Sequence, residues 1–165
     1  MQNGYALCTA EGLQAIAEYL GSSSPQQVDS LRGMLRIGLH RDVEVTEAGR
    51  EHGPLVSQAF CSALPVAYSS VPRPVWAPFA SLVLEAAYEA TLWGGVLNAL
   101  QGASNIVLLT SLGGGAFGND ERWIYSAIRR ALQLSGGIDL DVRIVSYRRP
   151  VPELIQLASD FQRRK

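Results

Sequence analysis

The chain has 165 residues, of which 47% are hydrophobic and 18% are charged, and this balance is typical of a globular protein. The formal net charge is −1, so neither nucleic acid nor an anionic membrane surface is an expected partner. The sequence shows no apolar run of the ~20 residues that span a bilayer, and no secretory signal peptide. Cys8 and Cys61 lack metal-binding spacing and indicate free thiols in a reducing, cytoplasmic compartment. The length suits a single domain, residues 1–165.

The N-terminal part of the chain predicts two short helices and then a strand. Thr9 is the expected N-cap of the first helix, whose apolar residues recur at helical spacing at Leu13, Ile16, Ala17 and Leu20. Residues 21–25, GSSSP, are the expected linker, and Pro25 suits the first position of a further helical turn. Residues 32–46 alternate apolar and polar side chains, which predicts a strand with a bulge or hairpin near Arg41.

Polar groups in this part of the chain lack the surroundings that catalysis needs. The strand predicted over 32–46 carries a mixed-charge cluster, interpreted as the solvated face of an edge strand, with a charged wall of a binding cleft as the alternative. Its members are Arg36, His40, Arg41, Asp42 and Glu44. A second strand, predicted over 56–64, contains Ser57, Cys61 and Ser62, but no G-x-S-x-G elbow surrounds them, and Cys61 is expected to be a small buried residue. His40 and His52 are too few to hold a metal, so no metal is predicted.

A long helix is expected in the middle of the chain. A proline-rich connector over 68–78 precedes it, and the helical pattern covers 79–100. Gly94 and Gly95 weaken this helix and predict a kink. Glu85 and Glu89 lie four residues apart on one face. Two such carboxylates are candidates for acid/base catalysis, but a pair of solvated helix charges is the favoured interpretation.

Residues 105–119, NIVLLTSLGGGAFGN, and the helical pattern after them form the centre of the predicted fold. The unbroken apolar run over 106–109 predicts a strand buried on both faces, because neither face alternates with polar residues. The glycines that follow predict a tight turn, and Asn119 or Asp120 would cap a helix over 121–134. A last strand is expected over 140–145, followed by a final helix after Pro152.

The glycine-rich turn has the features of an anion-binding loop. Backbone N–H groups at such a turn and at the helix start point outward unpaired, and the helix dipole adds partial positive charge. The simpler interpretation is a tight strand-to-helix connection without a ligand. Gly113, Gly115 and Gly118 match the G-x-G-x-x-G spacing, but no acidic residue closes the next strand and no Walker lysine follows. As an anion-binding loop, the turn predicts a small ligand that bears phosphate, because phosphate suits unpaired N–H groups at a helix start.

The expected elements between Trp76 and Tyr147 follow one another as helix, buried strand, glycine-rich loop, helix and last strand. The loop has the pattern glycine, small residue, glycine, variable residue, aromatic residue, glycine, in Gly113, Gly114, Gly115, Ala116, Phe117 and Gly118. This order and this loop resemble the C-terminal half of a macro domain and its second phosphate loop. The resemblance implies a three-layer α/β/α fold with a mixed, largely parallel sheet and helices on both faces. It also implies ADP-ribose as the ligand, a diphosphate held by the backbone amides of 114–117, and Tyr147 beside the adenine.

The N-terminal parts of a macro domain have no counterpart in the sequence. The Asn-x-x-Asn element and the first glycine loop are missing, and in that family they supply ribose contacts and most hydrolytic activity. Arg148 would lie beside Tyr147, outside the carboxyl end of the last strand, where ligands of open α/β sheets bind. A solvent-facing pair of Arg148 and Arg149 is the equal alternative. The expected ligand-binding residues are Gly113, Gly114, Gly115, Ala116, Phe117, Gly118, Asn119, Tyr147 and Arg148.

Three hypotheses about function follow from the sequence. The first is binding of ADP-ribose or a related nucleotide through the 113–119 loop, with no cofactor. The second is a hydrolase acting on ADP-ribosyl groups or phosphorylated nucleotides, although no catalytic base or nucleophile is identifiable. The third is an interaction protein, such as a homo-oligomer, in which four large aromatic residues partly cover a partner surface. These residues are Trp76, Phe79, Trp93 and Trp123.

Overall fold

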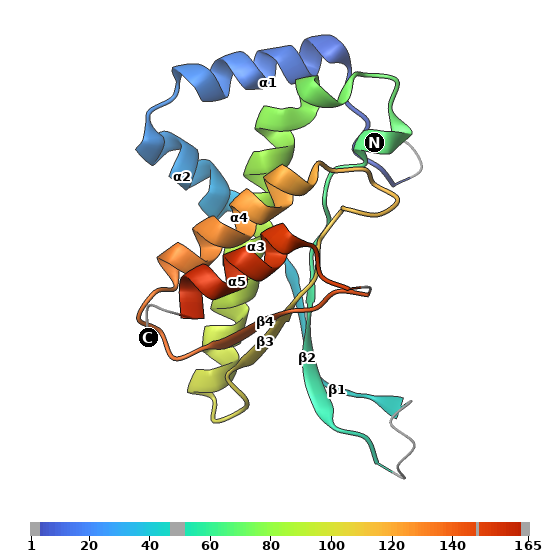
Figure 1. The fold of residues 1–165 in the computed structure, drawn as a ribbon. Coiled ribbons are helices and arrows are strands. Elements are labelled where there is room, and N and C mark those ends of the chain that lie inside the picture. The colour runs from blue at the N-terminus through green and yellow to red at the C-terminus, as the bar shows by residue number, and fades with distance from the viewer. Residues whose placement is uncertain (1–3, 47–51, 148, 163–165) are drawn as a thin grey trace.

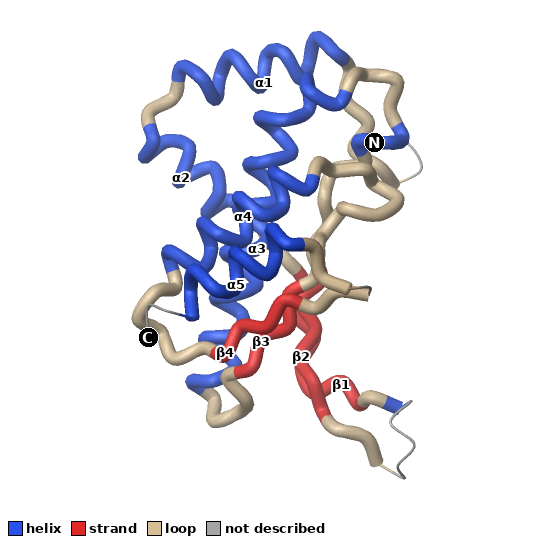
Figure 2. The backbone as a smooth tube through the Cα atoms, in the orientation of Figure 1, coloured by secondary structure: helices blue, strands red, loops and turns tan. Residues whose placement is uncertain are grey.

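The structure is a computed structural model, and it describes residues 4–46, 52–147 and 149–162. In chain order the elements are α1 (Ala10–Ser22), α2 (Pro25–Met34), β1 (Gly38–Glu44), β2 (Leu55–Phe60), the short 3₁₀ helix η2 (Val66–Tyr68), α3 (Arg73–Leu100), β3 (Ile106–Leu109), α4 (Glu121–Leu134), β4 (Asp141–Ile144) and α5 (Pro152–Gln162). Helices make up most of one side of the molecule, and the strands lie at its lower end in Figures 1 and 2.

The first two helices begin where the sequence predicts them. The Thr9 hydroxyl accepts a hydrogen bond from the Gly12 N–H and caps α1. At α2 the Ser24 hydroxyl accepts from the Gln27 N–H while the Gln27 side chain accepts from the Ser24 N–H, which is a complete capping box. Pro25 stands in the first turn as expected. The helix is longer than one turn and ends at Met34, so the strand starts later than predicted, at Gly38.

The long helix α3 begins earlier than the sequence predicts. The expected connector over 68–78 is wrong from Arg73 onward, because Pro74 and Pro78 are both helical. Proline is tolerated in a first helical turn, where its missing N–H would have no intrahelical partner. Pro78 lies beyond that turn and costs a hydrogen bond, but this part of α3 packs tightly, since Trp76, Ala80 and Leu84 are fully buried.

Gly94 and Gly95 let two different strands approach α3, which continues through both glycines as one helix. A β-carbon at Gly94 would lie 3.4 Å from Leu39 Cδ1 of β1. A β-carbon at Gly95 would lie only 2.4 Å from Val107 Cγ2 of β3, closer than such atoms approach one another. Tertiary packing therefore explains Gly95, whereas 3.4 Å at Gly94 is an ordinary van der Waals contact that a side chain could also make.

The strands form two separate sheets of two strands each. β1 and β2 pair antiparallel, while β3 and β4 pair parallel with Ile106 opposite Asp141 and Leu109 opposite Ile144. The break predicted near Arg41 is confirmed, because the register shifts between His40 and Val43. The described residues thus have α/β character, but the expected single, largely parallel sheet is not what they form.

The β3–β4 sheet is buried on one face only, so the prediction of a strand covered on both faces is wrong. Val107 and Leu109 are buried, whereas Ile106 and Leu108 remain 43% and 62% exposed. The buried side chains belong to one core that includes residues of α3, α4 and α5. All three helices therefore lie against the same face, and the described residues place no helix on the other.

Helix α4 carries the centre of this core, and its predicted bounds are confirmed at Glu121 and Leu134. Ile124, Ala127, Ile128 and Ala131 are buried along one side. Full burial of an isoleucine side chain contributes about 1.5–3 kcal/mol. A second core, around Leu13 and Trp76, joins α1 to the first half of α3.

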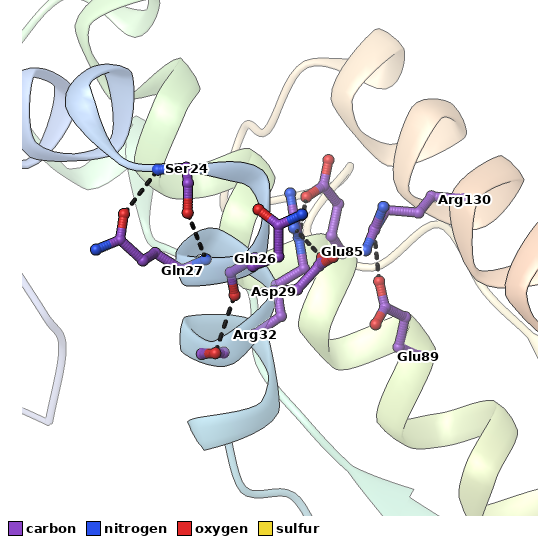
Figure 3. A network of polar contacts seen from close by, with 9 residues as sticks. Ser24, Gln26, Gln27, Asp29, Arg32, Glu85, Glu89 and Arg130 are labelled. Carbon is purple, nitrogen blue, oxygen red and sulfur yellow. Dashed lines mark hydrogen bonds and ion pairs between the residues drawn. The ribbon is translucent and has the colours of Figure 1, made fainter.

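Glu85 and Glu89 are ion-paired and not solvated, which corrects the favoured interpretation of this carboxylate pair. Arg32 Nε of α2 lies 2.7 Å from Glu85, and Arg130 Nε of α4 lies 2.7 Å from Glu89. Asp29 accepts from both arginines at 2.6 Å, so five charged groups connect α2, α3 and α4 (Figure 3). Each glutamate contributes one carboxylate oxygen to these ion pairs, so a structural role explains both residues.

Candidate functional site

The glycine-rich loop joins the carboxyl end of β3 to the start of α4, as predicted. It is built from turns that close on themselves. The Gly114 N–H donates to the Ser111 carbonyl at 3.1 Å, and the Gly118 N–H donates to the Gly115 carbonyl at 3.0 Å. The Asn119 N–H then donates to the Gly113 carbonyl at 3.0 Å and closes the loop at its base. The loop therefore has a defined shape of its own.

Two of its glycines are required by the fold. Gly113 has φ +76° and Gly118 has φ +67°, a conformation that L residues rarely adopt. A β-carbon would lie 2.3 Å from the Ala63 Cβ at Gly113, and 2.7 Å from the Ala67 Cβ at Gly118. The simpler interpretation, a tight connection without a ligand, is sufficient to explain these two positions.

Gly115 differs from them because nothing in the fold requires glycine there. It is exposed, its φ is outside the left-handed region, and a β-carbon would meet no atom within 4 Å. Gly114 is intermediate, because a β-carbon would lie 3.2 Å from Ile124 Cδ1. The open space above Gly115 is therefore the part of the loop that a ligand can approach.

Three successive backbone donors lie at this open part of the loop. Within the described residues, the N–H groups of Gly115, Ala116 and Phe117 have no hydrogen-bond partner. Gly115 and Ala116 are exposed and Phe117 is partly buried. Consecutive N–H groups in a turn attract anions because each carries partial positive charge.

Asn119 is placed beneath the loop and is 4% exposed. Its side-chain Nδ2 donates to the Leu64 carbonyl at 2.8 Å and approaches the Gly113 carbonyl at 3.4 Å. Among the described residues, its Oδ1 is buried without a partner. Asn119 therefore supports the loop from inside the protein, and the N-cap role belongs to Asp120.

Tyr88 of α3 holds the beginning of the loop, a contact that the sequence did not reveal. Its hydroxyl donates to the Thr110 carbonyl at 2.7 Å and accepts from the Leu112 N–H at 2.9 Å. Burial raises the pKa of Tyr88 far above its ordinary value, so the hydroxyl stays neutral and keeps both bonds. The sequence feature that could have indicated this contact is the position of Tyr88 among small residues on the apolar side of a predicted helix.

Phe117 belongs to an aromatic cluster beside the loop. Its ring lies 5.5 Å from that of Tyr68 and 6.0 Å from that of Tyr5, both edge-on, and Tyr5 and Tyr68 are 5.2 Å apart. The Phe117 carbonyl accepts from the Ala67 N–H at 2.9 Å, which ties the loop to η2. Tyr5 and Tyr68 are 38% and 46% exposed, so aromatic surface adjoins the free donors.

The first turn of α4 carries a neutralised charge pair. The Asp120 carboxylate accepts from the Arg122 N–H at 2.9 Å and from the Arg122 guanidinium at 2.7 Å. Hydrogen bonds from this guanidinium lower the pKa of Asp120 to about 2. The Asp120 carboxylate thus occupies the start of α4. An external anion would therefore bind the N–H groups of the loop, at 115–117.

The remaining expected site residues are not shown to join the loop. Tyr147 is fully exposed, three residues beyond the end of β4, and Arg148 lies outside the described residues. A hollow of about 460 Å³ is lined by Leu100, Asn105 and Leu140, near the opposite ends of β3 and β4. It is therefore separate from the loop.

The other candidate catalytic and metal-binding residues have the following surroundings in the described part of the chain. No group of three or more His, Cys, Asp or Glu residues there could hold a metal ion. Cys61 is partly buried, and burial raises the pKa of its thiol, which lies 3.9 Å from the Thr91 hydroxyl. Ser57 donates to Asn98 at 2.8 Å, and no hydrogen bond joins it to a histidine among the described residues. The mixed-charge cluster of β1 is exposed, with Arg41 bonded to Gln101.

The aromatic residues of the third hypothesis are mostly inside the protein. Trp76 is fully buried, Phe79 and Trp123 are partly buried, and only Trp93 is exposed, at 55%. Any surface that covers a partner must therefore be made mainly by other residues.

Comparison of the chain with protein-family models, with curated proteins and with solved structures gives no match. Within the described residues, no helix combines the length and apolar character that crossing a membrane would need.

Proposed function

We propose that the loop over 113–118 binds the phosphate groups of a small nucleotide, with ADP-ribose as the leading ligand. One observation carries this proposal: among the described residues the N–H groups of Gly115, Ala116 and Phe117 have no hydrogen-bond partner, and the space beside Gly115 is open. A diphosphate offers acceptors to all three donors and gains from their partial positive charge.

The aromatic cluster supports a nucleotide over an inorganic anion. The exposed parts of Tyr5 and Tyr68 lie next to Phe117, so a base or ribose attached to the phosphate would meet apolar, polarisable surface. The order of elements over 76–147 supports a macro-domain-like arrangement of this half of the chain, in which the same loop would carry the diphosphate.

Binding is favoured over hydrolysis as the function of this loop. The carboxylates nearest in sequence, Asp120 and Glu121, lie in the capped first turn of α4, and Asp120 is held by Arg122. A general base needs a free carboxylate or imidazole within reach of the water it activates. Asp120 is therefore not free to act as such a base.

The test is calorimetric titration of ADP-ribose into the wild-type protein and into a Gly115→Glu variant. This substitution adds a negative side chain to the open part of the loop without a packing collision. The matched control is Gly21→Glu in α1, which also meets no atom within 4 Å. We expect saturable binding by the wild type and by Gly21→Glu, with at least a tenfold loss in Gly115→Glu.

The protein concentration must reveal a dissociation constant of ~100 µM, about −5.5 kcal/mol. ADP and inorganic phosphate, titrated in parallel, separate recognition of a nucleotide from recognition of phosphate alone. Absence of saturable binding for all three compounds would show that the loop is structural. Equal binding by wild type and Gly115→Glu would place the ligand elsewhere.

A further inference from the structure

The second half of α3, yellow-green in Figure 1, carries a stripe of exposed apolar side chains. Trp93, Leu97 and Leu100 are 55%, 49% and 79% exposed. Their spacing of four and three residues puts them on one side of the helix, within an arc of about 60°. The strands β1 and β3 approach the other side of this half of α3, at Gly94 and Gly95. The stripe is therefore the side of α3 that the strands leave uncovered.

Residues from outside α3 extend the stripe into one continuous surface. Leu134, at the end of α4, is 52% exposed and lines a hollow together with Trp93. Val96 and Ile138 line this hollow and also the hollow at Leu100, so the two hollows adjoin. This surface, the α3 face, consists of Trp93, Val96, Leu97, Leu100, Leu134 and Ile138.

The α3 face has no charge of its own. The sequence contains no Asp, Glu, Lys, Arg or His over residues 90–119 or over 134–138. Two carboxylates line the hollows at its edge, Asp139 and Glu89, and Glu89 is ion-paired with Arg130. A helix side that faces water normally carries charged or polar residues. The face itself therefore gives a charged peptide or an anionic membrane surface nothing to pair with, and an apolar partner fits it.

We propose that the α3 face packs against the same face of a second copy of the chain, with the two α3 helices antiparallel and a two-fold axis at Leu97. At 1.5 Å per residue, Trp93 lies about 6 Å before Leu97 along the helix, and Leu100 about 4.5 Å after it. Antiparallel pairing therefore places Trp93 close to Leu100 of the partner subunit, on both sides of the axis. This proposal does not depend on the nucleotide-binding function of the glycine loop.

The apolar area of the α3 face has the size that a stable dimer needs. The exposed parts of Trp93, Leu97, Leu100 and Leu134 amount to roughly 100 Å² each, on the order of 400 Å² per subunit. A standard interface buries ~800 Å² per partner, of which a little over half is apolar. Four side chains thus supply most of the apolar area of an ordinary two-fold interface. An uncharged face also adds no repulsion between the copies.

The first experiment is sedimentation velocity of the full chain over a range of concentrations, for the wild type, Leu97→Glu and Ile155→Glu. Ile155 is also exposed on a helix, at 55%, but it lies on α5 and serves as the matched control. We expect a dimer for the wild type and for Ile155→Glu. The dimer dissociation constant of Leu97→Glu should rise at least 100-fold, because two carboxylates would meet at the axis. Circular dichroism and thermal melting establish that each variant is folded.

The second experiment tests the antiparallel arrangement without adding charge. Leu97→Cys, in a Cys8→Ser and Cys61→Ser background, places two thiols at the axis, where mild oxidation by copper phenanthroline should join the copies through a disulfide. Ile155→Cys in the same background is the control and should stay unlinked on a non-reducing gel. A wild-type monomer at all concentrations would overturn the proposal. So would a dimer that Leu97→Glu leaves intact, or a disulfide at 97 that forms no more readily than one at 155.

Discussion

Gly113→Ala should destabilise the protein strongly, whereas Gly115→Ala, two residues away in the same loop, should not. A side chain at φ +76° costs about 1–2 kcal/mol. The new β-carbon would lie 2.3 Å from the Ala63 Cβ, which cannot rotate away, and such overpacking costs about 1–3 kcal/mol. It would also lie 2.7 Å from the Asn119 amide nitrogen and disturb its bond to Leu64, worth about 1 kcal/mol. Together these effects predict a loss of about 3–6 kcal/mol.

Urea denaturation followed by circular dichroism measures this difference, because the slope of the transition should be the same in both variants. The melting temperature of Gly113→Ala should fall by roughly 6–24 °C, given about 2–4 °C per kcal/mol for a chain of this size. Gly115→Ala should stay within about 0.5 kcal/mol of the wild type, because its β-carbon meets open space. A loss below about 1 kcal/mol for Gly113→Ala would refute the loop geometry on which the site depends.

Two further substitutions test what holds the loop and the helices in place. Tyr88→Phe should lower the free energy of unfolding by about 1–3 kcal/mol, because the Thr110 carbonyl and the Leu112 N–H lose their partner. Chemical denaturation measures this loss. An equal loss in Tyr19→Phe, at an exposed tyrosine, would contradict the prediction. Arg130→Met should cost about 1–3 kcal/mol, less than a fully buried pair, since it leaves Glu89 unpaired at a partly buried position. Arg129→Met is the control, because Arg129 is more exposed, and it should cost less than about 1 kcal/mol. Thermal melts of both variants measure the difference. Equal losses in the two variants would show that the ion network does not stabilise the fold.

The sequence by itself determined most of the local structure. The starts of three helices were predicted within a residue or two, from Thr9, from Pro25 and from the pair Asn119 and Asp120. Such predictions succeed because capping depends on neighbours along the chain. The glycine-rich loop and its position between a strand and a helix were predicted for the same reason. The shift of register near Arg41 was also visible in the broken alternation.

The sequence could not show which side chains meet across the fold. Glu85 and Glu89 had the pattern of solvated helix charges, and only the arrival of Arg32 and Arg130 from other helices made them ion-paired. Tyr88 contacts the loop from 22 residues away. Such contacts depend on the relative placement of elements, and local spacing contains no information about it.

For the candidate site, too, sequence and tertiary structure supplied different information. Composition and periodicity identified the loop over 113–118 as the candidate anion site, because glycine content and helix position are properties of a short segment. Only the tertiary structure separated Gly113, which Ala63 and the backbone conformation require, from Gly115, which packing leaves unexplained. Only the tertiary structure also showed that β3 is covered on one face, because a continuous apolar run such as 106–109 is compatible with burial of one face or of both. The physical reason is that a strand's burial is set by the layers that pack on it, and here α3, α4 and α5 all pack on one.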